Sequence, residues 1–205
     1  MQSLWYLSRA TGVVSILLLT VVMVLGVVVN RQGRVPGFPQ FAVTGVHRNA
    51  SLLAVVFLVV HISTAIIDPY APINVVDAFV PFGSAYKPLW LGLGALALDL
   101  LIAVIVTSLV RVRMGHRAWR AIHWLAYAIW PVALLHGYRT GTDLRSGALL
   151  YVTVASVAVV AFAIGWRIVS TLRAVPHPAR THVVLDEQRA VHRDKRRNEH
   201  RTRTR

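Results

Sequence analysis

Cysteine is absent from all 205 residues of the chain. Without thiols the protein forms no disulfide, no thiolate-ligated iron–sulfur cluster and no thioether-linked prosthetic group, and it has no cysteine nucleophile. A glycine-rich dinucleotide fingerprint after a strand and a Walker loop are also missing from the sequence. Any nicotinamide-binding module must therefore lie on another chain.

Charge is scarce as well, at 15% of the residues, whereas 56% are hydrophobic and the mean hydropathy is +0.57. This composition is typical of an integral membrane protein. Several apolar runs approach the roughly 20 residues that a helix needs to cross a bilayer, and the alternation of an outer-membrane barrel is missing. The sequence predicts an all-α integral membrane fold over 1–172, a five-helix transmembrane bundle. The expected helices are 11–29, 47–67, 89–110, 121–138 and 148–169.

The first apolar run lies where a signal peptide would lie. Its apolar core is longer than that of a signal peptide, and no small-x-small cleavage site follows before Asn30 and Arg31. We therefore expect this run to remain as a membrane helix.

Lysine and arginine are distributed unequally between the segments that join the helices. Eighteen of the 22 lie on one side of the predicted bundle and four on the other. Cytoplasmic segments hold the excess of these residues. The sequence predicts a multi-pass protein of a bacterial-type cell (inner) membrane, with its amino terminus outside and its carboxyl terminus in the cytoplasm.

The segment 173–205 is rich in charge and poor in aromatic residues. Its ten Lys or Arg and four acidic residues contribute +6 of the total net charge of +14. Such a composition is typical of a disordered cytoplasmic tail that rests on anionic lipid headgroups. We expect the lipid bilayer, and no nucleic acid, to be its partner.

Histidine is the informative residue in the apolar runs. His47 and His61 flank the second predicted helix, 14 residues apart. His123 and His136 lie 13 residues apart on the fourth. Ionisable groups in membrane helices are costly and mark function by default, and at about 1.5 Å per residue each pair is separated by roughly 20 Å.

Helices 2 and 4 run in the same direction, so their histidines meet at two depths. His47 can face His123 near the cytoplasmic side, and His61 can face His136 near the outer side. Two stacked bis-imidazole sites are the axial geometry of low-spin haem in electron transfer, whereas zinc would require four ligands at one depth. On an ideal helix, however, 13 residues leave His136 roughly 140° from His123. A kink at Pro131 is a candidate source of the missing rotation.

The segment "GHRAWRAIHWLAYAIWPVALLHG" (residues 115–137) resembles the penultimate helix of the ferric reductase-like transmembrane domain family. The paired spacings of 14 and 13 are also those of that family, and the resemblance covers about residues 5 to 170. The family includes the cytochrome b parts of ferric reductases and NADPH oxidases, and the haem-binding subunit of the bacterial methionine sulfoxide reductase system. Members typically have six helices, of which this chain lacks the first. The flavin and nicotinamide domains of the oxidases are also missing.

The resemblance implies an electron-carrying membrane subunit of an oxidoreductase system with two b-type haems. By this resemblance, the iron ligands are His47 with His123 and His61 with His136. The implied electron donor is a cytoplasmic flavin reductase or quinol, and FMN or quinone is a further candidate cofactor. An extracytoplasmic acceptor or redox partner protein would take the electrons, without a catalytic residue or an NAD(P)H domain in this chain.

Further site candidates lie beside the histidines. Arginines near either face are placed to pair with haem propionates, or else extend to the membrane interface: Arg9, Arg48, Arg120 and Arg139. Asp99 in the third helix is a candidate for hydrogen bonding or proton movement. The loop 68–88 is expected to fold as a lid over the outer haem, with a structural cap as the equal alternative.

The sequence therefore predicts a transmembrane di-haem b-type cytochrome that passes electrons from the cytoplasmic side to an extracytoplasmic acceptor. A protein of a different class remains open at this point. A small proton or solute carrier would use the intramembrane histidines and Asp99 as a relay.

Overall fold

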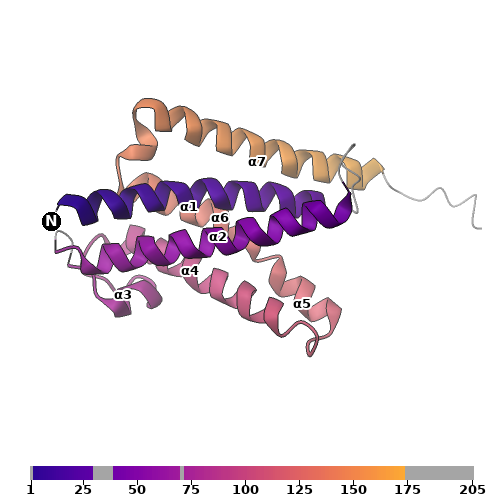
Figure 1. Ribbon diagram of the computed structural model, residues 1–205, viewed down its shortest axis with the longest axis horizontal. Coiled ribbons are helices and arrows are strands. Elements are labelled where there is room, and N and C mark those ends of the chain that lie inside the picture. Colours follow the sequence, from indigo (N-terminus) through magenta and orange to yellow (C-terminus); the bar gives the residue numbers. More distant parts are fainter. Residues whose placement is uncertain (1, 30–38, 70–71, 174–205) are drawn as a thin grey trace, which may run out of the picture. The chain divides into compact units, whose positions relative to one another are not determined.

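The computed structural model describes residues 2–29, 39–69 and 72–173 (Figure 1). The described residues form helices without any strand, which confirms the predicted all-α class. The elements are α1 Gln2–Val29, α2 Gln40–Ile67, α3 Val75–Phe79, α4 Pro88–Leu109, α5 His116–His123, α6 Ala126–Thr140, the 3₁₀ helix η1 Asp143–Arg145 and α7 Gly147–Arg173. Apart from Arg173, the predicted disordered tail lies outside the described residues.

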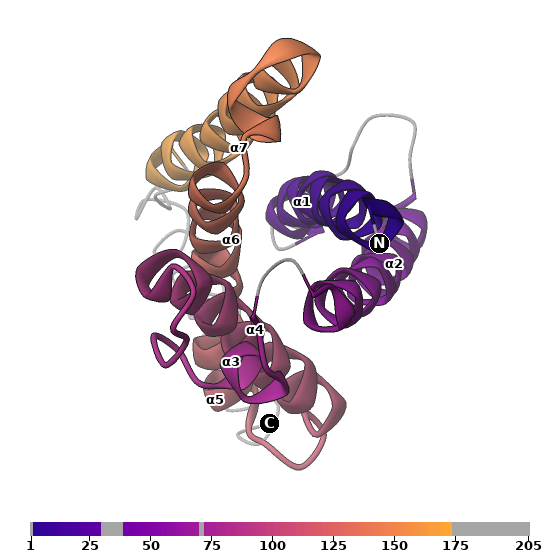
Figure 2. The same ribbon diagram turned by 90° about the vertical axis from the view of Figure 1, so that its left-hand side faces the viewer.

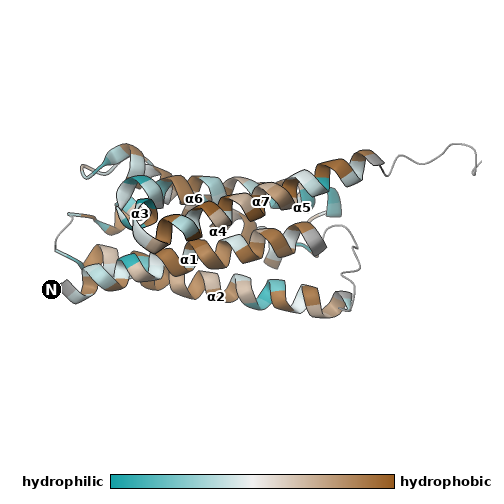
Figure 3. Ribbon diagram, turned by 90° about the horizontal axis from the view of Figure 1, so that it is seen from above, coloured by the Kyte–Doolittle hydropathy of each residue, from teal (hydrophilic) through white to brown (hydrophobic). Residues whose placement is uncertain are grey.

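Four of the described helices are long and apolar enough to cross a membrane: α1, α2, α4 and α7. Few of their large apolar side chains are buried and many are exposed, most of all in α7, which suits contact with lipid. Figure 3 shows hydrophobic residues along these helices. The predicted helix 121–138 is instead divided between the end of α5 and the 15-residue α6. A turn at Trp124 and Leu125 separates the two.

Contacts divide the chain into the units Met1–Gly165 and Trp166–Arg205, and the described part of the second is the last two turns of α7. Within the first unit the helices pair: α1 packs along α2, and α4 packs along α6 (Figure 2). A smaller contact between α1 and α6 joins the two pairs. Between the pairs lie the histidines of α2 and α6.

Polar side chains in α1 satisfy their hydrogen bonds locally, as an apolar environment requires. Thr11, Ser15 and Thr20 each donate to a carbonyl one turn earlier. Thr20 Oγ1 also accepts a 2.8 Å hydrogen bond from the buried indole N–H of Trp130 on α6. Met23, Trp130 and Val160 form the buried apolar cluster around this bond.

Replacing Thr20 by valine is expected to destabilise the bundle by about 1 kcal/mol, because hydrogen bonds between membrane helices contribute roughly 0.6 to 1.7 kcal/mol. The indole N–H of Trp130 would lose its acceptor in a buried position. Unfolding in mixed micelles of increasing SDS fraction, followed by circular dichroism, measures the loss. Thr20→Ser keeps the hydroxyl and should stay near wild type; equal losses in both variants would contradict the role of this bond.

Candidate haem site

His61 of α2 and His136 of α6 face each other across the gap between the helix pairs. Their ring centroids lie 6.5 Å apart, with an interplanar angle of 77°. A metal ion bound about 2 Å from one nitrogen of each ring would place the centroids roughly 6 Å apart. The observed centroid separation would thus allow both imidazoles to bind one metal ion.

Each of these imidazoles has one nitrogen fixed by a backbone carbonyl. Nδ1 of His61 lies 2.7 Å from the carbonyl oxygen of Ser8, and Nδ1 of His136 lies 2.7 Å from that of Trp90. Because a carbonyl only accepts, both Nδ1 atoms carry the proton and donate it. In a neutral ring the lone pair is then on Nε2, which is the arrangement of a metal-ligating histidine held by a backbone carbonyl.

Two glycines make room for these rings. A Cβ atom on Gly94 of α4 would lie 2.7 Å from Cε1 of His136, and one on Gly12 of α1 would lie 3.0 Å from Cε1 of His61. A contact of 2.7 Å essentially never occurs at a real Cβ, so a side chain at Gly94 would displace the imidazole; the 3.0 Å contact at Gly12 is tight but less severe. Glycine is needed at Gly94 because the ring approaches the helix backbone closely.

An apolar cavity, part of it open to the outside, lies beside this histidine pair. Both imidazoles line it, and almost all the other lining residues are apolar, from α1, α2, α3, α4 and α6. Asp77 is the only acidic residue in the lining. An apolar cavity with two convergent ligands suits a flat hydrophobic cofactor such as haem.

The second pair, His47 of α2 and His123 at the end of α5, is close enough for the charges of the two rings to interact. The Nδ1 atoms of both are buried, and neither has a hydrogen-bond partner among the described residues. The Val22 backbone lies close enough to the His47 ring for a hydrogen-bond interaction. Trp119 stacks on His123 at 5.0 Å between centroids. These two orphaned ring nitrogens fit a site that is completed by a ligand.

The winding between His123 and His136 changes directly after His123. Leu125 N–H donates to Ile122 O, and further i to i+3 bonds follow at Tyr127 and Ala128. Each residue wound in this 3₁₀ manner turns about 20° more than in an α-helix, so three or four supply roughly 60° to 80° of the missing rotation. The tighter winding therefore begins before Pro131, the residue at which the sequence predicts a kink. Pro131 itself lies within α6.

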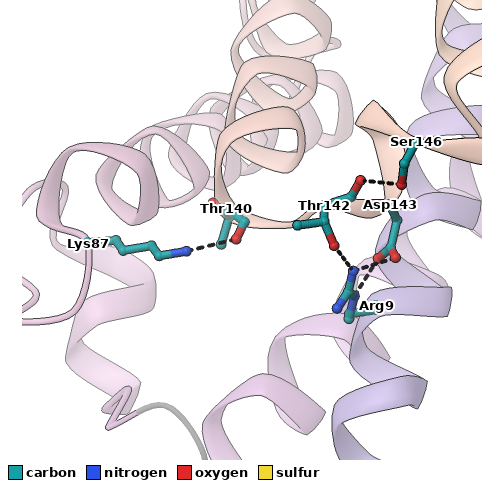
Figure 4. Close-up of polar contacts among 6 residues, drawn as sticks. All are labelled: Arg9, Lys87, Thr140, Thr142, Asp143 and Ser146. Atoms are coloured by element: carbon teal, nitrogen blue, oxygen red, sulfur yellow. Dashed lines mark hydrogen bonds and ion pairs between the residues drawn. The ribbon is translucent and has the colours of Figure 1, made fainter.

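The four predicted propionate arginines lie in different surroundings. Arg9 binds both carboxylate oxygens of Asp143, and its Nη2 also donates to Thr142 Oγ1 at 2.9 Å (Figure 4). Arg139 stacks over the ring of Trp90 at 4.9 Å. Arg48 and Arg120 are both exposed. Arg48 directly follows His47 in sequence, and Arg120 lies three residues before His123. Asp99 is half-buried near the middle of α4.

Sequence reasoning missed Ser8, Gly12, Trp90 and Gly94. Gly94 falls in "GLGALA", which reads as ordinary small-residue packing between membrane helices. Gly92, two residues earlier, lies against Phe82 in the α3–α4 connection, whereas Gly94 lies against the imidazole of His136. The two glycines therefore differ only in the residue that each one contacts, and a single sequence does not contain that information. Among the described residues no group of three or more His, Cys, Asp or Glu is arranged to hold a metal.

Comparison with known proteins gives one match. The family model described as ferric reductase-like transmembrane component matches residues 11–134. No curated protein and no solved structure matches the chain. The matched region includes three of the four histidines and ends two residues before His136.

Proposed function

The chain belongs to the family of ferric reductase-like transmembrane components, and from this premise we propose that it is a di-haem b-type cytochrome of the cell membrane. Membership supports a membrane electron-transfer component of the oxidoreductase type. Our proposal adds two haems b, held by His61 with His136 and by His47 with His123. It also adds transfer from the cytoplasmic side to an extracytoplasmic acceptor.

The observation that carries the proposal is the His61–His136 pair, with its 6.5 Å centroid separation and its two Nδ1 atoms bonded to carbonyls. A bound b-type haem supplies a one-electron couple at its iron. The protein's part is to orient both Nε2 atoms and to exclude water with the apolar lining of the cavity. Trp119 holds the ring of His123 by stacking in the other pair.

The surrounding charges support the remaining parts of the proposal. The 18 to 4 distribution of lysine and arginine favours a cytoplasmic carboxyl terminus. It therefore supports the proposal that His47 and His123 lie toward the cytoplasm. Arg48, Arg120 and Arg139 carry exposed guanidinium groups near the pairs and are proposed to bind propionates. The guanidinium of Arg9 is largely engaged by Asp143, so it contributes least.

The sequence contains no glycine-rich dinucleotide fingerprint. A cytoplasmic flavin reductase or quinol is therefore proposed as the electron donor, with FMN or quinone as an additional cofactor. A redox partner protein or a small molecule outside the membrane would accept the electrons.

Purified full-length protein is expected to show the bands of b-type cytochrome in a dithionite-reduced minus oxidised spectrum, with about two haems per chain. Because each haem depends on one pair, His61→Ala or His136→Ala should lower the ratio to about one, and so should His47→Ala or His123→Ala. The ratio is measured as pyridine haemochrome against protein concentration.

His116→Ala is the matched control for these variants. His116 is exposed at the start of α5 and packs on Trp119, next to His123, without belonging to either pair. It should keep both haems. If the wild type shows no b-type bands, or if all four ligand variants keep the full haem content, the cytochrome proposal fails and the proton or solute carrier gains support.

A further inference from the structure

The connection between α2 and α4 returns along α4 instead of remaining beyond its end. The backbone of Phe82 lies against Gly92, and Ile73 and Ala78 line the same cavity as Gly94 and other α4 residues. Since α4 begins at Pro88, the positions 92–98 lie roughly 6 to 15 Å along its axis at about 1.5 Å per residue. Residues 73–82, here called the α3 flap, thus lie beside the first turns of a membrane-spanning helix.

The outer side of the α3 flap is apolar and exposed. Five large side chains are about half exposed or more: Val75 58%, Val76 65%, Phe79 51%, Val80 48% and Phe82 50%. The first four follow the i, i+1, i+4, i+5 pattern that groups residues on one side of a helix. Asp77, between them in sequence, lines the cavity instead. Water-exposed surfaces rarely gather so many large apolar groups.

Several backbone N–H groups in and next to the flap are hydrogen-bonded locally. Asp77 N–H donates to Asn74 O at 3.0 Å, and Asn74 N–H donates to the Asp77 carboxylate at 2.9 Å. Val80 N–H and Gly83 N–H also bond to carbonyls within the segment. Hydrocarbon tolerates only backbone that is satisfied in this way.

We propose that the α3 flap inserts its exposed apolar side into the lipid of the leaflet at the His61–His136 end of the bundle. Lipid acyl chains are its partner, because the patch continues the lipid-facing surfaces of the flanking helices at Ile67 and Leu89, which are 65% and 54% exposed. Lys87 marks the polar boundary, where its exposed amine donates to Thr140 O at 3.0 Å (Figure 4). The proposal goes beyond the cytochrome function and does not depend on haem.

The absence of cysteine makes this proposal directly testable. Val76→Cys and Phe79→Cys are labelled with a nitroxide in the full chain and reconstituted in phosphatidylcholine–phosphatidylglycerol vesicles. Power saturation then compares collisions with oxygen, which concentrates in lipid, and with a water-soluble nickel chelate. Both sites are expected to favour oxygen several-fold over nickel, as Val56→Cys on the exposed side of α2 should.

Ser146→Cys, in the exposed connection before α7, is the aqueous reference. Nickel accessibility at Val76→Cys and Phe79→Cys equal to that reference would overturn the proposal, because the flap would then face water. Protection from both reagents would overturn it too, since protein such as a second copy would then cover the patch. Unchanged circular dichroism shows that the labelled variants are folded.

Discussion

Gly94→Ala is expected to remove one of the two haems, lowering the haem-to-protein ratio from about two to about one. The added Cβ would lie 2.7 Å from Cε1 and 2.8 Å from Nδ1 of His136. This ring has little freedom to move, because its Nδ1 is bound to the Trp90 carbonyl. Ligand geometry must be held within about 0.5 Å, so the forced displacement breaks the site.

The helix itself should gain from this substitution. Alanine is favoured over glycine inside a helix by up to about 1 kcal/mol, so a loss of haem would not come from unfolding of α4. Gly26→Ala is the matched control, since its Cβ would meet His47 at an ordinary 3.4 Å. Gly12→Ala, at 3.0 Å from His61, should lie between the two. Full haem content and an unchanged spectrum in Gly94→Ala would contradict the role of this glycine.

Asp143→Arg is expected to lower the free energy of unfolding by about 1 to 3 kcal/mol. This loss lies between the losses that follow when exposed and when buried ion pairs are broken. Arg9 and Asp143 form a bidentate pair, and their side chains are 24% and 34% exposed. Reversal of one charge places two cations together. Arg9 also directly follows Ser8, whose carbonyl accepts from His61, so the variant should release haem at a lower temperature. Soret absorbance during heating measures this.

The double variant Arg9→Asp with Asp143→Arg distinguishes a true pair from two independent sites. With the charges exchanged, part of the lost stability should return. Losses that simply add would show that the two side chains contribute separately. Arg145→Asp is a control with a charge change of the same size and opposite sign in the same connection, at an exposed residue outside the pair; it should have a small effect.

Much of the helical framework follows from the apolar runs, because a hydrocarbon environment allows few alternatives to a helix. Family membership and the all-α membrane class are both confirmed. The tight winding at Leu125 was not predictable in the same way. No glycine or proline marks Trp124 and Leu125, and the apolar pattern is the same for α and 3₁₀ turns. Pro131 is the only proline between His123 and His136, so the sequence points to it and not to Leu125.

The histidine pairing was inferred from spacing along two helices, and the structure places His61 and His136 with facing rings. Their role as iron ligands stays a prediction. What spacing could not supply is the surroundings of each ring, because Ser8 and Trp90 lie 53 and 46 residues away from their histidines in sequence. Backbone carbonyls also have no sequence signature, since every residue carries one.

The Arg9–Asp143 pair also constrains the order in which the chain is assembled during synthesis. Its two residues are separated by 134 positions, whereas α1 and α2 are neighbours in sequence and pack along each other. The α1–α2 pair can therefore form while the ribosome is still translating, but the guanidinium of Arg9 waits until the connection after α6 has emerged. This contact therefore forms later than the hydrogen bond between Trp130 and Thr20, whose two residues are 110 positions apart, and it adds a second link between α1 and the later-synthesised part of the chain.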